Sequence, residues 1–311
     1  MLRSVPSILE YQASLQSEAP AILGLDQPSC SYGQLYELVQ HTVSSLNSVG
    51  LSRNDPVAVV LQNGPMMAAV FLAVASGFAC APLNPAFTAA EFEFYLADLQ
   101  AKALLIDSGS TSPASEVAKR LGIPVIHACS SPNEAAGSFT LDIEDSASET
   151  RLPVFARPND VALILHTSGT TQRPQMVPLT QKNICSSARN IVETLQLSPA
   201  DLCLNIMPLF HIHGLIAVVL SSMLAGGRIA CTPGFYVNQF FSWLESFKPT
   251  WYTAVPSMHQ SIIDRARSSA LTNRKDSLRF IRSSSASLAP NVLSELESLF
   301  GVPVIEAYSM T

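Results

Sequence analysis

The chain reads Leu165-His166-Thr167-Ser168-Gly169-Thr170-Thr171-Gln172-Arg173-Pro174-Gln175 directly after an apolar run that begins at Val161. A short apolar run bounded by turn-forming residues is typical of a buried strand. A loop of hydroxyl residues and glycine that leaves such a strand can direct backbone N–H groups and side-chain hydroxyls at a polyphosphate. Because Ser, Thr and Gly also favour turns, an ordinary polar loop is the alternative.

The order of these residues resembles the phosphate-binding signature of the adenylate-forming enzymes, the superfamily of acyl-CoA synthetases, luciferases and peptide-synthetase adenylation domains. The common form of that signature is T-S-G-T-T-G-x-P-K-G. Thr167 to Thr171 and Pro174 match it, whereas Gln172 replaces a glycine, Gln175 replaces the lysine and Met176 replaces the last glycine. The other phosphate loop, G-x-x-x-x-G-K-[ST], is excluded because no Gly-Lys pair follows Gly169 at that spacing.

The composition allows a large buried core. The chain has 311 residues, of which 48% are hydrophobic and 14% are charged. These values fit one large domain or two smaller ones. The formal net charge of −6 and the scattered lysines and arginines argue against a nucleic-acid partner.

The cysteines and the chain ends indicate an intracellular protein. The cysteines form no C-x-x-C motif, and within apolar runs they behave as small hydrophobes, so we expect reduced thiols of a cytoplasmic protein. The N-terminus does not resemble a signal peptide, and no segment has the ~18 unbroken apolar residues of a membrane span. A peroxisomal S-K-L address would lie beyond Thr311 and stays open. The cysteines are Cys30, Cys80, Cys129, Cys185, Cys203 and Cys231.

Short apolar runs alternate with longer helical patterns along the chain. Such alternation predicts an α/β fold with parallel sheets covered by helices. Expected strands are Val57–Leu61, Ala103–Asp107, Ile123–His127, Val161–Leu165, Leu202–Ile206, Arg228–Cys231, Trp251–Ala254, Arg279–Ser283 and Pro303–Ala307. Expected helices are Ser31–Val49, Pro65–Ser76, Thr88–Leu99, Ala114–Leu121, Gln181–Gln196, Leu215–Leu224, Val237–Phe247, Ser257–Arg267 and Pro290–Phe300.

The segment Ser130–Pro158 is rich in Ser, Pro, Ala and Glu, and we expect it to link two α/β subdomains. The first would span residues 1–150, and the second, with the phosphate loop, residues 151–311. The resemblance implies two predominantly parallel sheets in a layered αβαβα arrangement. It also implies that a third β subdomain and a mobile C-terminal domain with the catalytic lysine are absent, so we expect an N-terminal fragment that is inactive alone.

Two histidines occur in Pro208-Leu209-Phe210-His211-Ile212-His213-Gly214, between an expected strand and an apolar helix. Their i, i+2 spacing with no third ligand nearby argues against zinc, and a buried or hydrogen-bonded pair is the simplest reading. The segment also resembles the superfamily element P-x-F-H-x-x-G, whose histidine lines the acyl pocket. The resemblance therefore implies that His211, and with it His213, belongs to the substrate pocket.

The segment Arg282-Ser283-Ser284-Ser285-Ala286-Ser287-Leu288 follows an expected strand. By itself it fits a helix-entry loop. In the superfamily the equivalent segment forms one side of the adenine pocket and the back of the acyl pocket, where small residues let a flat ring approach the backbone. This implies that Ser285, Ala286 and Ser287 contact adenine, and that Ser284 and Ser285 border the substrate.

The chain ends Glu306-Ala307-Tyr308-Ser309-Met310-Thr311, which resembles the motif Y-G-x-T-E. The tyrosine of that motif stacks on adenine and its threonine contacts the α-phosphate, which implies these roles for Tyr308 and Thr311. The motif's glutamate, which helps to hold magnesium, would be residue 312. Apart from nucleotide-bound Mg²⁺, we therefore expect no metal in the chain.

The matching motifs occur in the superfamily's order from about Tyr32 to Thr311 and also include Ala81-Pro82-Leu83-Asn84-Pro85. The segment Trp251–Pro256 and the serine-rich segment look most like the oxalate–CoA ligase and 4-coumarate–CoA ligase-like branch. The resemblance implies an ATP-dependent ligase that forms an acyl-adenylate from a small acid such as oxalate and passes it to coenzyme A. Thr167, Ser168, Gly169, Thr170, Thr171, Gln172 and Gln175 would then hold the phosphates of ATP.

Two alternatives stay open. An adenylation or loading domain would use the same chemistry but pass the acyl group to a carrier protein. A degenerate, non-catalytic nucleotide-binding relative is favoured by Gln172 and by Gln175, which carries no charge where the superfamily usually has lysine.

Overall fold

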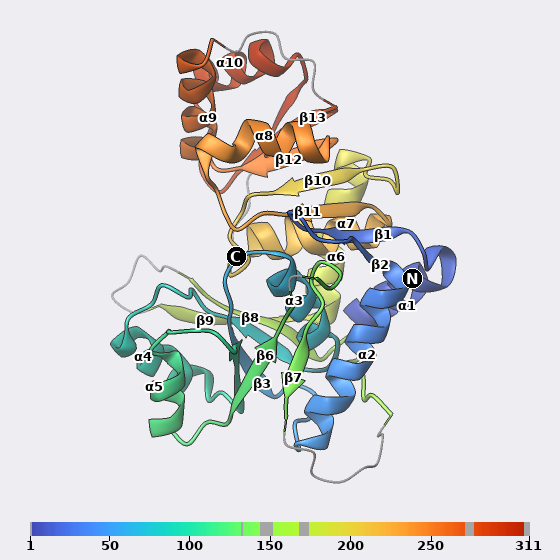
Figure 1. The fold of residues 1–311 in the computed structure, drawn as a ribbon, viewed down its shortest axis with the longest axis vertical. Helices are drawn as coiled ribbons and strands as arrows, with labels where there is room; N and C mark the ends of the chain where they lie inside the picture. The colour runs from blue at the N-terminus through green and yellow to red at the C-terminus, as the bar shows by residue number, and fades with distance from the viewer. Residues whose placement is uncertain (1, 132, 144–151, 168–173, 271–276, 308–311) are drawn as a thin grey trace.

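The structure is a computed structural model of the chain. Its described residues form two seven-stranded sheets (Figure 1). The structure describes residues 2–131, 133–143, 152–167, 174–270 and 277–307. The first sheet, sheet A, has the order β14-β13-β12-β10-β11-β1-β2. Its strands are β14 (Val304–Ala307), β13 (Phe280–Ser284), β12 (Trp251–Ala254), β10 (Leu202–Asn205), β11 (Arg228–Cys231), β1 (Pro20–Leu23) and β2 (Cys30–Ser31).

The second sheet, sheet B, has the order β7-β6-β5-β3-β4-β8-β9. Within the described residues, pairing is antiparallel only at the edges, between β1 and β2 in sheet A and at β6–β7 and β8–β9 in sheet B. The predominantly parallel character predicted from the alternating pattern is therefore confirmed. The strands of sheet B are β7 (Thr140–Asp142), β6 (Val125–Cys129), β5 (Ala103–Asp107), β3 (Pro56–Val60), β4 (Ala79–Pro82), β8 (Val161–Thr167) and β9 (Gln175–Thr180).

Three layers of helices cover the sheets and complete the predicted αβαβα arrangement (Figure 1). The middle layer contributes to a continuous apolar cluster with strands of both sheets, and α3 contacts β8 of sheet B and β11 of sheet A. The middle helices are α1 (Val5–Gln16), α2 (Tyr32–Ser48), α3 (Pro65–Gly77), α6 (Gln181–Leu195), the π-helix η1 (His213–Leu220) and α7 (Ser221–Ala225). Sheet A is covered on its outer face by α8 (Val237–Phe247), α9 (Pro256–Ser268) and α10 (Pro290–Phe300), and sheet B by α4 (Ala89–Leu99) and α5 (Ala114–Arg120).

Helix α3 shows why the middle layer forms. Every residue from Met67 to Gly77 is buried, as expected for a helix that has a sheet on either side. Gly77 allows the close approach of α2, because a Cβ there would lie 2.9 Å from Val43 Cγ1. Pro65 occupies the first turn, where its missing N–H leaves no helix hydrogen bond unmade.

Most of the predicted elements are confirmed, several of them to the residue. Strands Ala103–Asp107, Arg228–Cys231 and Trp251–Ala254 and helices Val237–Phe247 and Pro290–Phe300 have the predicted bounds. The predicted strand Ile123–His127 begins two residues later, at Val125, because the Ile123 N–H still donates to the Ala118 carbonyl of α5. None of the helices in the described residues has the length and apolar character needed to span a bilayer.

The segment Ser130–Pro158 is not only a linker, because it contains β7, which pairs with β6 at the edge of sheet B. The division near residue 150 is not followed by the sheets either. Strand β1 joins sheet A beside β11, and β8 joins sheet B beside β4. The sequence pattern gives the elements but carries no signal for these pairings, since they join segments far apart in the chain.

Candidate active-site cavity

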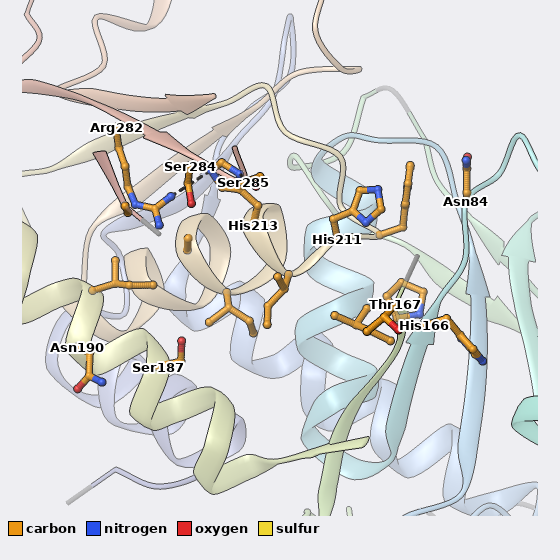
Figure 2. A pocket seen from close by; sticks show the side chains of 18 of the residues that line it. Asn84, His166, Thr167, Ser187, Asn190, His211, His213, Arg282, Ser284 and Ser285 are labelled. Carbon is orange, nitrogen blue, oxygen red and sulfur yellow. Dashed lines mark hydrogen bonds between the residues drawn. The ribbon is translucent and has the colours of Figure 1, made fainter. Parts of the chain in front are cut away.

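A cavity of about 940 Å³ lies where the carboxyl ends of strands from both sheets meet. Ligands of open α/β sheets usually bind at this end of the strands. Figure 2 shows Arg282, Ser284, Ser285 and His213 gathered on one side of it, and Asn84, His166 and Thr167 on the other. The lining comes from the ends of β4, β8, β13 and β14, the segment before η1, and α6.

The histidine-rich segment enters the cavity because the chain turns tightly into η1. A Cβ at Gly214 would lie 2.4 Å from the Pro208 carbonyl oxygen, so only glycine fits at this close approach. The π-helix begins at His213, and π-helical turns are frequent at functional sites. His211 and His213 both line the cavity, as predicted. His211 also lies against the ring of Phe210, with ring centroids 4.5 Å apart.

His213 is held by hydrogen bonds from both sides of its ring. Its Nε2 lies 2.6 Å from Thr253 Oγ1 and 3.1 Å from Nη1 of Arg282, and its Nδ1 lies 3.0 Å from Ser285 Oγ. A guanidinium can only donate, so Nε2 must accept and the proton of the neutral ring lies on Nδ1. The Nδ1–H group then donates to Ser285, which leaves the serine hydroxyl hydrogen free to donate into the cavity.

The protonation states of this cluster follow from its burial. Burial, assisted by the Arg282 guanidinium, lowers the pKa of His213 to about 3, so the ring is neutral at pH 7. Burial also lowers the pKa of His211. Burial lowers the pKa of Arg282 only to about 10, and this side chain therefore keeps its charge at pH 7.

The two hydroxyl residues at the end of β13 differ in their surroundings from the two residues that follow. Ser284 is buried and Ser285 exposed, and both line the cavity. Ser285 has φ +77°, a left-handed conformation that costs a non-glycine residue energy and is common at functional sites. Ala286 and Ser287, predicted to contact adenine, are exposed and are not part of the cavity lining.

The ends of the predicted phosphate loop are the paired strands β8 and β9. Thr167 lines the cavity at the end of β8, and Gln175 lies directly opposite it at the start of β9, exposed and outside the cavity lining. The loop therefore connects two antiparallel strands, whereas the sequence pattern had shown only the first. Seven further predicted ATP contacts lie outside the described residues: Ser168, Gly169, Thr170, Thr171 and Gln172 of the loop, and Tyr308 and Thr311 at the end of the chain.

Several polar residues of the cavity lining were not given a role from the sequence, among them Arg282, His166 and Asn84. His166 precedes Thr167, and its Nε2 lies 2.9 Å from Asp98 Oδ2 on α4, while Tyr95 packs edge-on against its ring. The sequence signal for Arg282 is a charged residue directly after the apolar pair Phe280-Ile281 of the strand. In the described part of the chain, no three His, Cys, Asp or Glu side chains are grouped as a metal site.

Comparison with known proteins gives concordant matches. Residues 9–311 match the family described as AMP-binding enzyme. An oxalate–CoA ligase of Arabidopsis thaliana is 43% identical over 99% of this chain and 60% of its own length, and one of Saccharomyces cerevisiae is 35% identical over 83% and 51%. MatB from Rhodopseudomonas palustris superposes with a TM-score of 0.83 at 22% identity, covering 100% of this chain and 60% of MatB. The chain thus spans about 60% of the length of the first of these relatives.

Proposed function

The chain belongs to the AMP-binding enzyme family, and from this we propose that its cavity is the adenylation site of an acid–CoA ligase. The observation that carries the proposal is the meeting of three family motifs at one cavity: Thr167 of the phosphate loop, the histidine-rich segment and the serines that end β13. These motifs are separated in sequence and have no reason to converge if each were an ordinary loop.

The proposed reaction has two steps. An oxygen of the substrate carboxylate forms a bond to the α-phosphorus of ATP, and pyrophosphate leaves with the electrons of the bond that breaks. The thiolate of coenzyme A then attacks the acyl carbon, and AMP leaves. In such chemistry the protein acts mainly by positioning the reactants and by stabilising charge. Magnesium, bound to the nucleotide phosphates, would offset their charge.

The residues of the cavity divide between the two substrates in this proposal. Thr167, with Ser168–Thr171 and Gln172, would hold the β- and γ-phosphates, and Gln175 would lie at the edge of that site. Tyr308 and Thr311 would contact adenine and the α-phosphate, with Ser285 beside the adenine. His211, His213 and Ser284–Ser285 would border the acid.

The acid that we propose is short, and oxalate is the first candidate because the relatives above are oxalate–CoA ligases. The same names support coenzyme A as the acceptor over a carrier protein. A non-catalytic nucleotide-binding role is the second candidate, because Gln175 is uncharged where the family signature has lysine. We expect residues 1–311 alone not to complete the reaction, since the resemblance places the catalytic lysine after residue 311.

The test is an activity measurement on the full-length protein. Oxalate, ATP, Mg²⁺ and coenzyme A are expected to yield oxalyl-CoA, AMP and pyrophosphate. A thermal shift with ATP and Mg²⁺ measures nucleotide binding separately, since a ligand that binds the folded state raises its apparent stability. A protein that is stabilised by ATP but releases no pyrophosphate with any acid of a broad panel would support the non-catalytic role.

A further inference from the structure

Arg282 is a buried cationic side chain to which the proposed chemistry gives no role. It lies on β13, has an exposed fraction of 6% and contributes to the cavity wall. Arginine is rarely buried unless an anion accompanies it, because removing a charge from water is costly. Its position therefore requires an explanation in terms of what it contacts.

The described residues use only one of the three guanidinium nitrogens of Arg282. Nη1 donates to His213 Nε2 and, over 3.2 Å, to Thr253 Oγ1. Nε and Nη2 donate to no described residue. An arginine fork has five N–H donors in one plane and suits a carboxylate, which can accept two of them side by side. The guanidinium is thus fixed through Nη1 and keeps an unused edge.

No carboxylate of the described chain neutralises Arg282. It takes part in none of the ion pairs of the described residues, whereas Arg279 of the same segment pairs with Asp201. The neighbouring strand β14 carries Glu306, which pairs in register with Ser283 and not with Arg282. Glu306 also lines the cavity, but its Oε1 accepts a hydrogen bond from the Leu288 N–H, and it forms no ion pair with Arg282.

We infer that Arg282 is the specificity residue of the acid site, and that it binds the second anionic group of a short dianionic acid such as a dicarboxylate. The inference rests on the proposed function and deepens it. The first carboxylate must stay free of Arg282, because it has to reach the α-phosphate of ATP. The second carboxylate would accept hydrogen bonds from the unused edge of Arg282, with the hydroxyl of Ser285 as a further donor. A monoanionic acid would leave the guanidinium buried and without a counter-ion.

The competing explanation is that Arg282 only positions His213. The two explanations differ in what happens to different acids. If Arg282 binds a second carboxylate, its loss weakens the use of dianionic acids selectively. If it only positions His213, its loss affects dianionic and monoanionic acids alike.

The experiment measures kcat/KM of the full-length protein and of its Arg282→Met and Arg282→Lys variants. The substrates are the dianions oxalate and malonate and the monoanions glycolate and acetate, with pyrophosphate release as the readout. We expect Arg282→Met to lower kcat/KM for the preferred dianion by on the order of 10- to 100-fold, mainly through KM, because a charged hydrogen-bond pair is lost. For the monoanions we expect a change below about threefold. Arg282→Lys keeps the charge without the fork and should lose less.

Arg228→Met is the matched control, because Arg228 is an arginine of β11 in the same sheet, outside the cavity lining. It should leave the dianion-to-monoanion ratio of kcat/KM unchanged. An equal loss for all four acids in both Arg282 variants would overturn the inference while leaving the proposed function intact. A parent protein that activates none of the acids would instead overturn the proposed function. If Arg282→Met does not fold, as judged by circular dichroism, the ratio measured for Arg282→Lys decides.

Discussion

Arg282 donates from Nη1 to Nε2 of His213 across 3.1 Å, and this single contact determines where the imidazole proton lies. The ring must accept at Nε2 and donate at Nδ1. Arg282 of β13 therefore determines, through His213, the direction in which the Ser285 hydroxyl donates. A cation placed beside a neutral histidine thereby prepares a hydroxyl to donate at the cavity surface.

The tautomer of His213 can be measured directly. We expect Nδ1 to carry the proton and Nε2 to be bare in the full-length protein at pH 7, because the Arg282 guanidinium that faces Nε2 can only donate. Nitrogen-15 spectra of histidine-labelled protein distinguish the two ring nitrogens, and a His213→Gln variant assigns the signals. A proton found on Nε2 would contradict the hydrogen-bond scheme described for this cluster.

The buried histidines should make the protein sensitive to mild acid. Burial lowers the pKa of His213 to about 3 and that of His259 to about 4, against about 6.5 in an unfolded chain. Between those values the unfolded state binds protons that the folded state does not. The contribution of the two neutral histidines to the unfolding free energy is therefore fully present above pH 6.5 and is lost as the pH falls below it. Each group adds a slope of up to about 1.4 kcal/mol per pH unit.

Urea denaturation at pH 5 and pH 7 measures this slope. His259→Phe removes one of the two groups and should reduce the loss of unfolding free energy between these pH values by up to about 2 kcal/mol, because the window to pH 6.5 covers one and a half units. Retention of the parent's full pH dependence in His259→Phe would show that His259 does not supply part of it.

Ser285 and Ser287 form a matched pair for testing the acid site. Ser285 lines the cavity and accepts from His213, whereas Ser287 lies two residues further on and outside the lining. We expect Ser285→Ala to raise the KM for the acid by about tenfold, since one hydrogen bond to a charged group is lost. Ser287→Ala should leave it unchanged. Equal effects of the two substitutions on steady-state kinetics would argue against this placement of the acid.

A substitution at Gln175 tests the edge of the proposed phosphate loop. Restoring the family's positive charge with Gln175→Lys should tighten ATP binding by on the order of 10- to 100-fold, because a charged hydrogen bond to phosphate is regained. Met176→Lys adds the same charge to the neighbouring residue, whose side chain points to the other face of β9, and serves as the control. Calorimetry that gives one ATP affinity for both variants would show that position 175 does not contact phosphate.

The parts of the fold that could be predicted are those determined by residues close together in the sequence. The capping box of Thr88 and Glu91 and the buried run Trp251–Ala254 are short-range signals, and the structure reproduces both. Helix α1 and strand β9 were missed. Strand β9 is half exposed and contains Pro178, so it shows neither a buried run nor regular alternation.

The order of the motifs was enough to predict part of the candidate site. The remaining residues are brought to it by packing between segments far apart in the chain. His211, His213, Ser284 and Ser285 were identified from the sequence and all line the cavity. The role of Arg282 could not be predicted from the sequence, because it depends on a contact with His213 that forms only when η1 packs against β13. The exclusion of Ala286 and Ser287 from the lining likewise depends on where the chain leaves the sheet after Ser285.

The pairing of β1 with β11 has a consequence for how the protein is made. Ile22 leaves the ribosome 207 positions before its partner Ile229. At bacterial or eukaryotic translation speeds of roughly 5–20 residues per second, that interval lasts on the order of 10–40 seconds. Throughout it, the nascent strand can pair with β2 on one edge, but its other edge has no partner. Biosynthesis should therefore depend on chaperones at this stage more than the stability of the finished molecule would suggest.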